Sequence, residues 1–96
     1  MFTHVVLFKL KENTKENVSF VANTLKAMKA KIPQLMDLEI GVDELHSDRS
    51  FDICLITRFA SIDEMNEYQI HPYHVDEVLS KIKSYIKVSK VADYNV

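Results

Sequence analysis

The sequence predicts an α+β fold of the ferredoxin-like type, in which two helices cover one face of a four-stranded antiparallel sheet. The first observation behind this prediction is the order of hydrophobic patterns along the 96 residues, which reads β-α-β-β-α-β. The second is that two predicted strands, residues 2–11 and 51–59, are apolar on both faces, as strands in the centre of a sheet are. The usual closure of this order, with the strands arranged 4-1-3-2, puts both of them in the centre.

The first strand is predicted over residues 2–11 because β-branched and aromatic residues dominate there. A helix follows, since either Asn13 or Thr14 can cap it and apolar residues then recur at helical spacing. Those apolar residues are Val18, Val21, Ala22, Leu25, Met28 and Ile32. Pro33 ends the helix, because the residue before a proline avoids helical backbone.

The second strand is predicted over residues 35–43, where apolar and polar residues alternate strictly. Its apolar face consists of Met36, Leu38, Ile40 and Val42. A strand with one solvent-exposed face is typical of the edge of a sheet. Residues 44–50 are polar and are expected to connect it, in the manner of a hairpin, to the strand at 51–59.

The second part of the helical layer is predicted in two pieces. Ser61 and Glu64 have the spacing of a capping box, which opens a short helix. Pro72 interrupts this helix, and a further helix is predicted over residues 74–84. The last strand is predicted over residues 86–95.

Composition and charge argue against several classes of function. The formal net charge is −2 without a basic cluster, so nothing attracts the chain to nucleic acid or to an anionic membrane. Gly41 is the only glycine, which leaves no phosphate-cradling loop, and Cys54 is the only cysteine, which leaves no disulfide within the chain. No apolar run approaches the roughly 20 residues that span a membrane. Since residues 1–9 lack the features of a signal peptide, we expect one soluble, cytoplasmic domain over residues 1–96.

The two-sided apolarity of the central strands also predicts a partner. Two helices can cover only one face of a four-stranded sheet, so Val5, Leu7, Cys54 and Ile56, or the residues opposite them, are left as an apolar patch. A second copy of the chain, laid sheet against sheet, would cover that patch. We therefore expect a two-fold homodimer formed through the sheet face.

The segment Tyr68-x-x-His71-Pro72-x-His74 carries the most distinctive chemistry in the chain. An imidazole with an ordinary pKa of about 6.5 can take a proton from a carbon next to a carbonyl. A tyrosine hydroxyl can donate a hydrogen bond to the oxygen on which the resulting charge builds. Pro72 breaks the helix and can turn His74 inward, near the start of the next helix, whose dipole favours a neutral imidazole.

Each of these residues also has a structural interpretation, and the residues alone leave both open. The ring of His71 can cap a backbone group at the helix break. His74 and His4 can be hydrogen-bonded core histidines, and Tyr68 can pack in the core with its hydroxyl bonded. A metal site formed by His4, His71 and His74 is a third possibility, but Pro72 disturbs the helical geometry that such a pair needs, and we predict no metal and no cofactor.

Taken together, these residues resemble the stress-responsive dimeric α/β-barrel (Dabb) family over essentially the whole chain. The matching segments are His4-Val-Val-Leu-Phe-Lys9, Ile32-Pro33 with Gly41, Phe51-Asp-Ile-Cys-Leu55, Phe59 with Ser61, the Tyr68 to His74 segment, and Asp93-Tyr94. The most specific of them is His-Pro-x-His in combination with a histidine on the first strand. The resemblance implies two ferredoxin-like subunits whose sheets pack into a shared barrel. Asp93 and Tyr94 are expected to serve that interface or to end the sheet.

The resemblance also implies a function, because some plant members look like cofactor-independent polyketide cyclases that close a ring by aldol condensation. By motif position, the base of such an enzyme falls on His74 and its assisting phenol on Tyr68. The remaining pocket residues are expected to be His4, Val6, Phe8, Val21, Leu25, His71 and Val78.

We therefore predict a pocket for a small apolar carbonyl or aromatic compound, served by His74 as general base and Tyr68 as hydrogen-bond donor. Catalysis there would be that of a cofactor-independent cyclase, lyase or isomerase. Two alternatives stay open: a non-catalytic, stress-associated ligand-binding dimer, and a cofactor-free monooxygenase that acts on quinol-like substrates.

Overall fold

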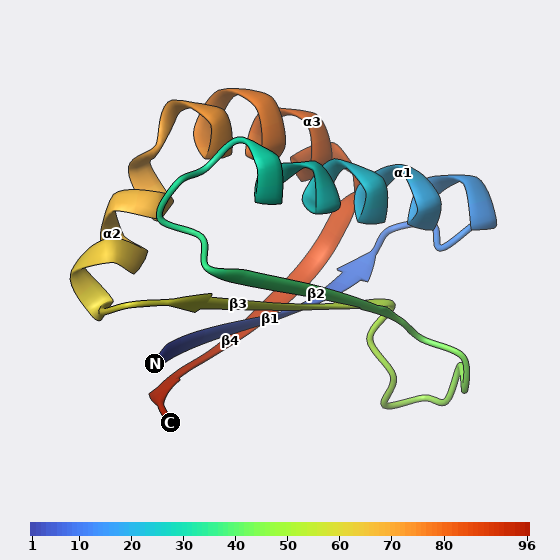
Figure 1. Cartoon of the computed structure of the whole chain (residues 1–96). Helices are drawn as coiled ribbons and strands as arrows, with labels where there is room; N and C mark the ends of the chain where they lie inside the picture. The colour runs from blue at the N-terminus through green and yellow to red at the C-terminus, as the bar shows by residue number, and fades with distance from the viewer.

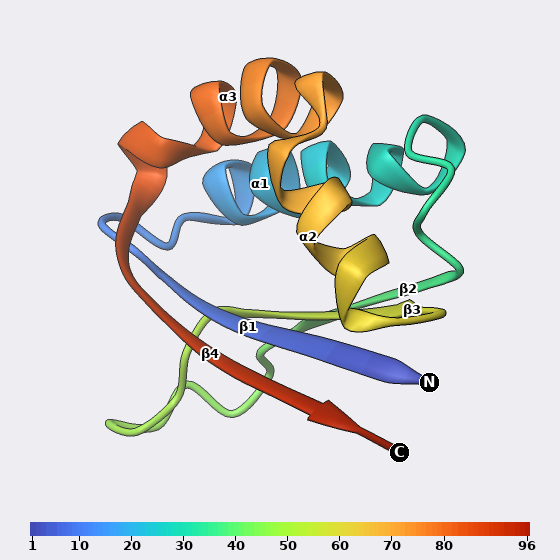
Figure 2. The same cartoon turned by 90° about the vertical axis from the view of Figure 1, so that its left-hand side faces the viewer.

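The structure, a computed structural model, describes residues 1–96 and contains one four-stranded sheet. Its strands are β1 (Phe2–Leu10), β2 (Asp37–Val42), β3 (Ile53–Phe59) and β4 (Ile86–Asn95). They pair antiparallel in the order β2-β3-β1-β4, so the two doubly apolar strands are central, as predicted. Figures 1 and 2 show all helices on one face of this sheet and none on the other.

The helical layer consists of a first helix and a segmented second one. The elements are α1 (Lys15–Lys26) with the 3₁₀ turn η1 (Ala27–Ala30), α2 (Ile62–Ile70), the π-helix η2 (Tyr73–Leu79), α3 (Ser80–Ile82) and the 3₁₀ turn η3 (Lys83–Tyr85). Thr14, and not Asn13, caps α1, since its hydroxyl accepts the Asn17 N–H at 3.2 Å. No helix of the chain is both long and apolar enough to cross a membrane.

The regular helix predicted over residues 74–84 is instead a wide π-turn that tightens into α and then 3₁₀ turns. In the π-turn the Ser80 N–H donates to the carbonyl of Val75, five residues back, where an α-helix would use the residue four back. The side chains of His74, Val78 and Ile82 all face the sheet and are buried. The break predicted at Pro72 is confirmed, but the turn that follows it is wider than predicted.

One face of the sheet forms the core together with the helices. The core contains 17 buried apolar residues. From the two central strands it takes Phe2, Val6, Phe8, Leu10, Ile53, Leu55 and Phe59. Met36, predicted to lie on the same face of β2, precedes that strand and is 52% exposed.

The opposite face of the sheet carries Val5, Leu7, Cys54 and Ile56, and all four are partly exposed. The structure thus decides between the two sets of residues that the sequence left open. Val5 lies directly across from Ile56, and Leu7 directly across from Cys54. The result is a continuous apolar band across the two central strands, on the face without helices.

Candidate functional site

A cavity of about 200 Å³ lies between the helical layer and the sheet. Six of the predicted site residues line it: His4, Val6, Phe8, Leu25, Tyr68 and His74. The lining also includes six residues that sequence reasoning missed: Leu55, Gln69, Leu79, Ile82, Ser89 and Val91. Four of the missed residues are apolar, and nothing in the sequence distinguishes them from other apolar residues of the same helices and strands.

The ring of Tyr68 is a neighbour of both cavity histidines. Its centroid is 4.4 Å from that of His74 and 6.3 Å from that of His4. Phe59 packs against the same ring at a centroid distance of 5.0 Å. The fold therefore brings together a helix histidine and a strand histidine that are 70 residues apart in the chain (74 minus 4).

The hydrogen bonds of His74 fix which ring nitrogen is free. Its Nδ1 lies 3.1 Å from the carbonyl oxygen of Gln69, and because a carbonyl can only accept, Nδ1 carries the proton. Nε2 then has the lone pair and makes no hydrogen bond within the chain. A neutral imidazole of this tautomer can act as a base at Nε2.

Burial lowers the pKa of His74 below its ordinary value. The hydrogen bond to Gln69 opposes this shift, and the neighbouring His4 and His71 add smaller lowering effects to the pKa. The cause is mainly desolvation in the cavity, where the charged imidazolium would lose its water. His74 is therefore neutral, and available as a base, at neutral pH.

His4 is held by an acidic residue of the last strand. Its Nδ1 lies 2.5 Å from a carboxylate oxygen of Asp93, which sits directly opposite His4 in the β1–β4 pairing. The carboxylate accepts from Nδ1–H, and the Nε2 atom of His4 makes no hydrogen bond within the chain. Sequence reasoning placed Asp93 at the interface or at the end of the sheet, whereas the structure places its carboxylate on the ring of a cavity histidine.

The hydroxyl of Tyr68 is turned into the core and not toward the histidines. It donates to the Sδ of Met28 at 3.7 Å, and thioether sulfur is a weak acceptor. Burial raises the pKa of the Tyr68 phenol far above its ordinary value. Tyr68 is therefore a neutral phenol whose ring forms a wall of the cavity.

Two substitutions at Tyr68 separate packing from hydrogen bonding. Tyr68→Ala removes a ring that is 1% exposed and should reduce the free energy of unfolding by about 3–5 kcal/mol. Tyr68→Phe removes only the bond to sulfur and should cost less than about 1 kcal/mol. Urea denaturation of the three proteins measures both values, and equal losses would show that the hydroxyl, not the ring, stabilises this part of the core.

His71, Val21 and Val78 do not line the cavity. The Nδ1 of His71 accepts the Tyr73 N–H at 3.1 Å, which is the capping role at the helix break that was one of its two interpretations. Val21 and Val78 are fully buried in the core. No three His, Cys, Asp or Glu side chains are arranged to hold a metal ion.

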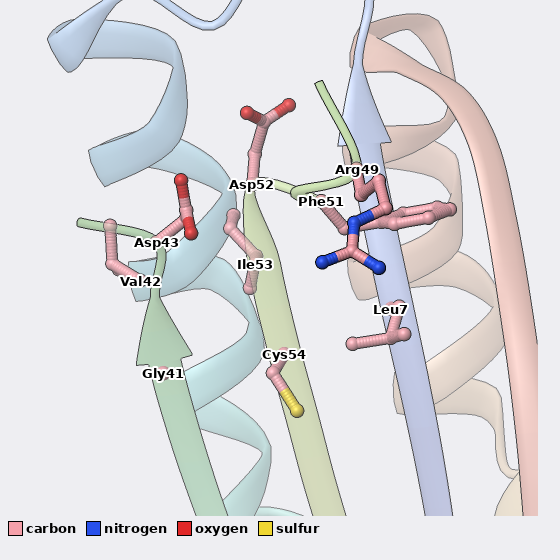
Figure 3. Close-up of a pocket in the computed structure, with 9 residues that line it drawn as sticks. All are labelled: Leu7, Gly41, Val42, Asp43, Arg49, Phe51, Asp52, Ile53 and Cys54. Atoms are coloured by element: carbon pink, nitrogen blue, oxygen red, sulfur yellow. The ribbon is translucent and has the colours of Figure 1, made fainter. Parts of the chain in front are cut away.

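A separate pocket of about 340 Å³ lies on the opposite, uncovered side of the sheet, near the β2–β3 connection. Figure 3 shows that Leu7, Cys54 and Arg49 line it, and none of the predicted site residues does. Burial, with a smaller effect from Glu39, raises the pKa of the Cys54 thiol, which disfavours the reactive thiolate. The histidine cavity is therefore the stronger candidate for a functional site.

Comparison with known proteins gives a family match and a consistent fold. The model of the stress-responsive A/B barrel domain, Dabb, matches residues 2–96, and no curated protein matches the chain. The chain is similar to a dimeric protein of unknown function and ferredoxin-like fold from Bacteroides fragilis, with 26% identity, a TM-score of 0.82, and coverage of 99% of this chain and 95% of that one. It is also similar in fold to a hydroxynitrile lyase from Passiflora edulis, with 13% identity, a TM-score of 0.82, and coverage of 97% and 90%. An antibiotic biosynthesis monooxygenase has the same fold at 11% identity and a TM-score of 0.73, with coverage of 100% and 98%.

Proposed function

The chain belongs to the stress-responsive A/B barrel (Dabb) family, and we propose that its histidine cavity binds a small carbonyl compound and removes a proton from the carbon next to the carbonyl. The reaction class is that of a cofactor-independent lyase, isomerase or cyclase. The observation that carries this proposal is the state of His74. It is a buried imidazole, neutral at neutral pH, with its Nδ1 occupied by a backbone carbonyl and its Nε2 free of protein partners.

The other cavity groups can position the carbonyl oxygen. When His4 carries a proton on Nε2, that proton can be donated to the oxygen, while Asp93 keeps the ring in place through Nδ1. The hydroxyl of Tyr68 can take the same role if it exchanges the thioether of Met28 for the ligand oxygen, and the exchange replaces a weak acceptor with a better one. Proton removal at one end of the cavity and oxygen stabilisation at the other is the arrangement that enolate formation needs.

The size of the cavity limits the substrate. About 200 Å³ is less than the roughly 300–1,000 Å³ of typical ligand pockets. An engineered protein cavity of about 150 Å³ binds benzene, so this one has room for one small ring or a short carbonyl chain. A fold relative that is a lyase is consistent with chemistry on a compound of that size.

The experiment that tests the proposal follows deuterium uptake by a small ketone. Propanone in D₂O is incubated with the protein, and loss of the proton signal is followed by NMR. Because His74 acts only when neutral, and because its pKa lies below the ordinary value of about 6.5, the catalysed rate should rise with pH on the acid side of about 6.5 and be level above it. A rate that grows as the pH falls, or no exchange above that of the buffer, would contradict a basic His74.

We further propose that the band of Val5, Leu7, Cys54 and Ile56 packs against the same band of a second copy. Removing these apolar side chains from water stabilises such a contact. The Bacteroides fragilis protein, 26% identical, is described as dimeric. A sheet-to-sheet dimer leaves the histidine cavity on the helical side of each sheet, so each copy keeps its own site.

A further inference from the structure

The histidine cavity continues into a second pocket along the edge of the sheet. This pocket measures about 270 Å³ and lies between the strands β1 and β4 and the end of the helical layer. Four of its lining residues, Phe8, Leu79, Ile82 and Ser89, also line the histidine cavity. Figure 2 shows β4 as the outer strand beneath α3, so the second pocket lies at an edge of the sheet. We call it the edge groove.

We infer that the edge groove is a binding subsite for an apolar tail that ends in an anionic group, such as a carboxylate. The tail belongs to the carbonyl compound whose reacting end occupies the histidine cavity, and this part of the inference rests on the proposed function. The substrate class is then an oxo acid with an apolar chain between its carbonyl and its acid group.

The apolar character of the groove comes from side chains of both layers. Phe8 and Ile82 are buried at its base, while Leu79 remains 40% exposed at the junction with the cavity. Ile86, which lines the groove and not the cavity, is partly exposed. A chain that leaves the cavity along this path would remove these apolar surfaces from water, and each added methylene contributes to affinity.

The charge of the groove is positive, because Lys83 is its only charged lining residue. Lys83 forms no ion pair within the chain, whereas the neighbouring Lys81 is bound to Glu77 at 3.2 Å. Lys83 is exposed and borders apolar side chains of the groove, so its ammonium offers an anion a partner at the solvent end of the groove. A neutral tail would leave this cation without a partner.

The test is a binding series measured by calorimetry and NMR titration. The ligands are methyl ketones from propanone to nonanone and, for the longest chain, the oxo acid of equal length. Within the series, affinity should rise about fourfold per methylene once the chain extends beyond the cavity. The oxo acid should bind about twofold to fivefold more tightly than the neutral ketone, as expected for a partly exposed ion pair.

Two variants identify the group that recognises the acid. In Lys83→Met the ratio of the two affinities, oxo acid to ketone, should fall to about one. In Lys87→Met, which changes an exposed lysine that lines neither pocket, the ratio should stay at its wild-type value. Equal ratios in the wild type and in Lys83→Met would overturn the assignment of the anionic end.

Methyl NMR of the wild-type protein tests the apolar part without any substitution. Nonanone should shift the methyl signals of Ile86, which lines the edge groove and not the histidine cavity, and propanone should not. Affinity that is independent of chain length, or shifts at Val5 and Ile56 on the uncovered side of the sheet instead, would overturn the subsite. Failure of the proposed function is seen separately. If affinity rises with chain length but no deuterium exchange occurs, the edge groove is supported as a binding subsite and the role of His74 as a base is contradicted.

Discussion

Replacing His74 by glutamine should reduce the protein-catalysed deuterium exchange of propanone by about 10²–10⁴-fold, the usual contribution of a positioned general base. Glutamine is polar and of similar length, and its amide can still donate to the carbonyl of Gln69. It has no basic nitrogen, so a lower exchange rate is caused by the loss of the base and not by a change in how the cavity is filled. The rates are measured by NMR at pH 7.5, where the wild-type His74 is neutral.

The matched control is His46→Gln, because the side chain of His46 is 67% exposed in the β2–β3 connection, away from the cavity. This variant should exchange propanone at the wild-type rate. If His74→Gln also exchanged at that rate while remaining folded by circular dichroism, the base would be another group. If neither it nor the wild type exchanged any ketone but both bound one, the cavity would be a non-catalytic binding site.

The second large effect is expected on the oligomeric state. The wild-type protein should sediment with twice the 11.1 kDa mass of one chain, and Ile56→Asp should sediment as a monomer. Ile56 lies in the middle of the apolar band, across from Val5, so a dimer of the variant would bury two unpaired carboxylates near its centre. Burying an unpaired charge costs several kcal/mol.

Ile70→Asp serves as the control for this experiment. Ile70 is 77% exposed at the end of α2, on the helical side of the sheet, and its variant should remain dimeric. Sedimentation velocity over a range of concentrations separates the three proteins. A wild-type protein that is monomeric throughout, or an Ile56→Asp variant that stays dimeric, would show that the apolar band does not join two copies.

Most of the fold could be predicted from the sequence because the pattern of apolar and polar residues in a strand indicates whether the strand is central or at the edge of the sheet. The strands that are apolar on both faces, β1 and β3, are central, and β2, with its alternation of leucine or isoleucine and acidic residues, is at the edge. These patterns depend on side-chain burial alone, so they are visible without knowledge of the contacts. The same reasoning could not choose which face of β1 the helices cover, because Val5 and Leu7 are as apolar as Val6 and Phe8.

The candidate site could be predicted only in part. The approach of His4, Tyr68 and His74 follows from the fold, since β1 lies under the helical layer and the break at Pro72 turns His74 inward. The bond between His4 and Asp93 depends on which residues of β1 and β4 lie opposite each other. That register shifts within the pairing, between Lys9 and Leu10, and such an irregularity has no signature in this sequence.

The sequence does not decide the role of His71, for a related reason. Whether the ring of His71 reaches the backbone N–H two residues ahead depends on the local geometry of the helix break. The sequence specifies only that a histidine is available there. The edge groove also has no signature in the sequence. It depends on how the strands β1 and β4 lie against the end of the helical layer, not on any one residue.

Because η2 is a π-helix, the position of the His74 side chain depends on the number of residues between Pro72 and Ser80 and not only on the presence of a histidine. Successive residues of an α-helix are rotated by about 100°, so one residue fewer between Pro72 and Ser80 would convert the wide turn into a regular one and rotate His74 relative to Ile82. Two homologues can therefore both have a histidine after this proline and still differ in whether it reaches the cavity. When family members are compared, we therefore expect a one-residue gap in this segment to change which side chain faces the cavity.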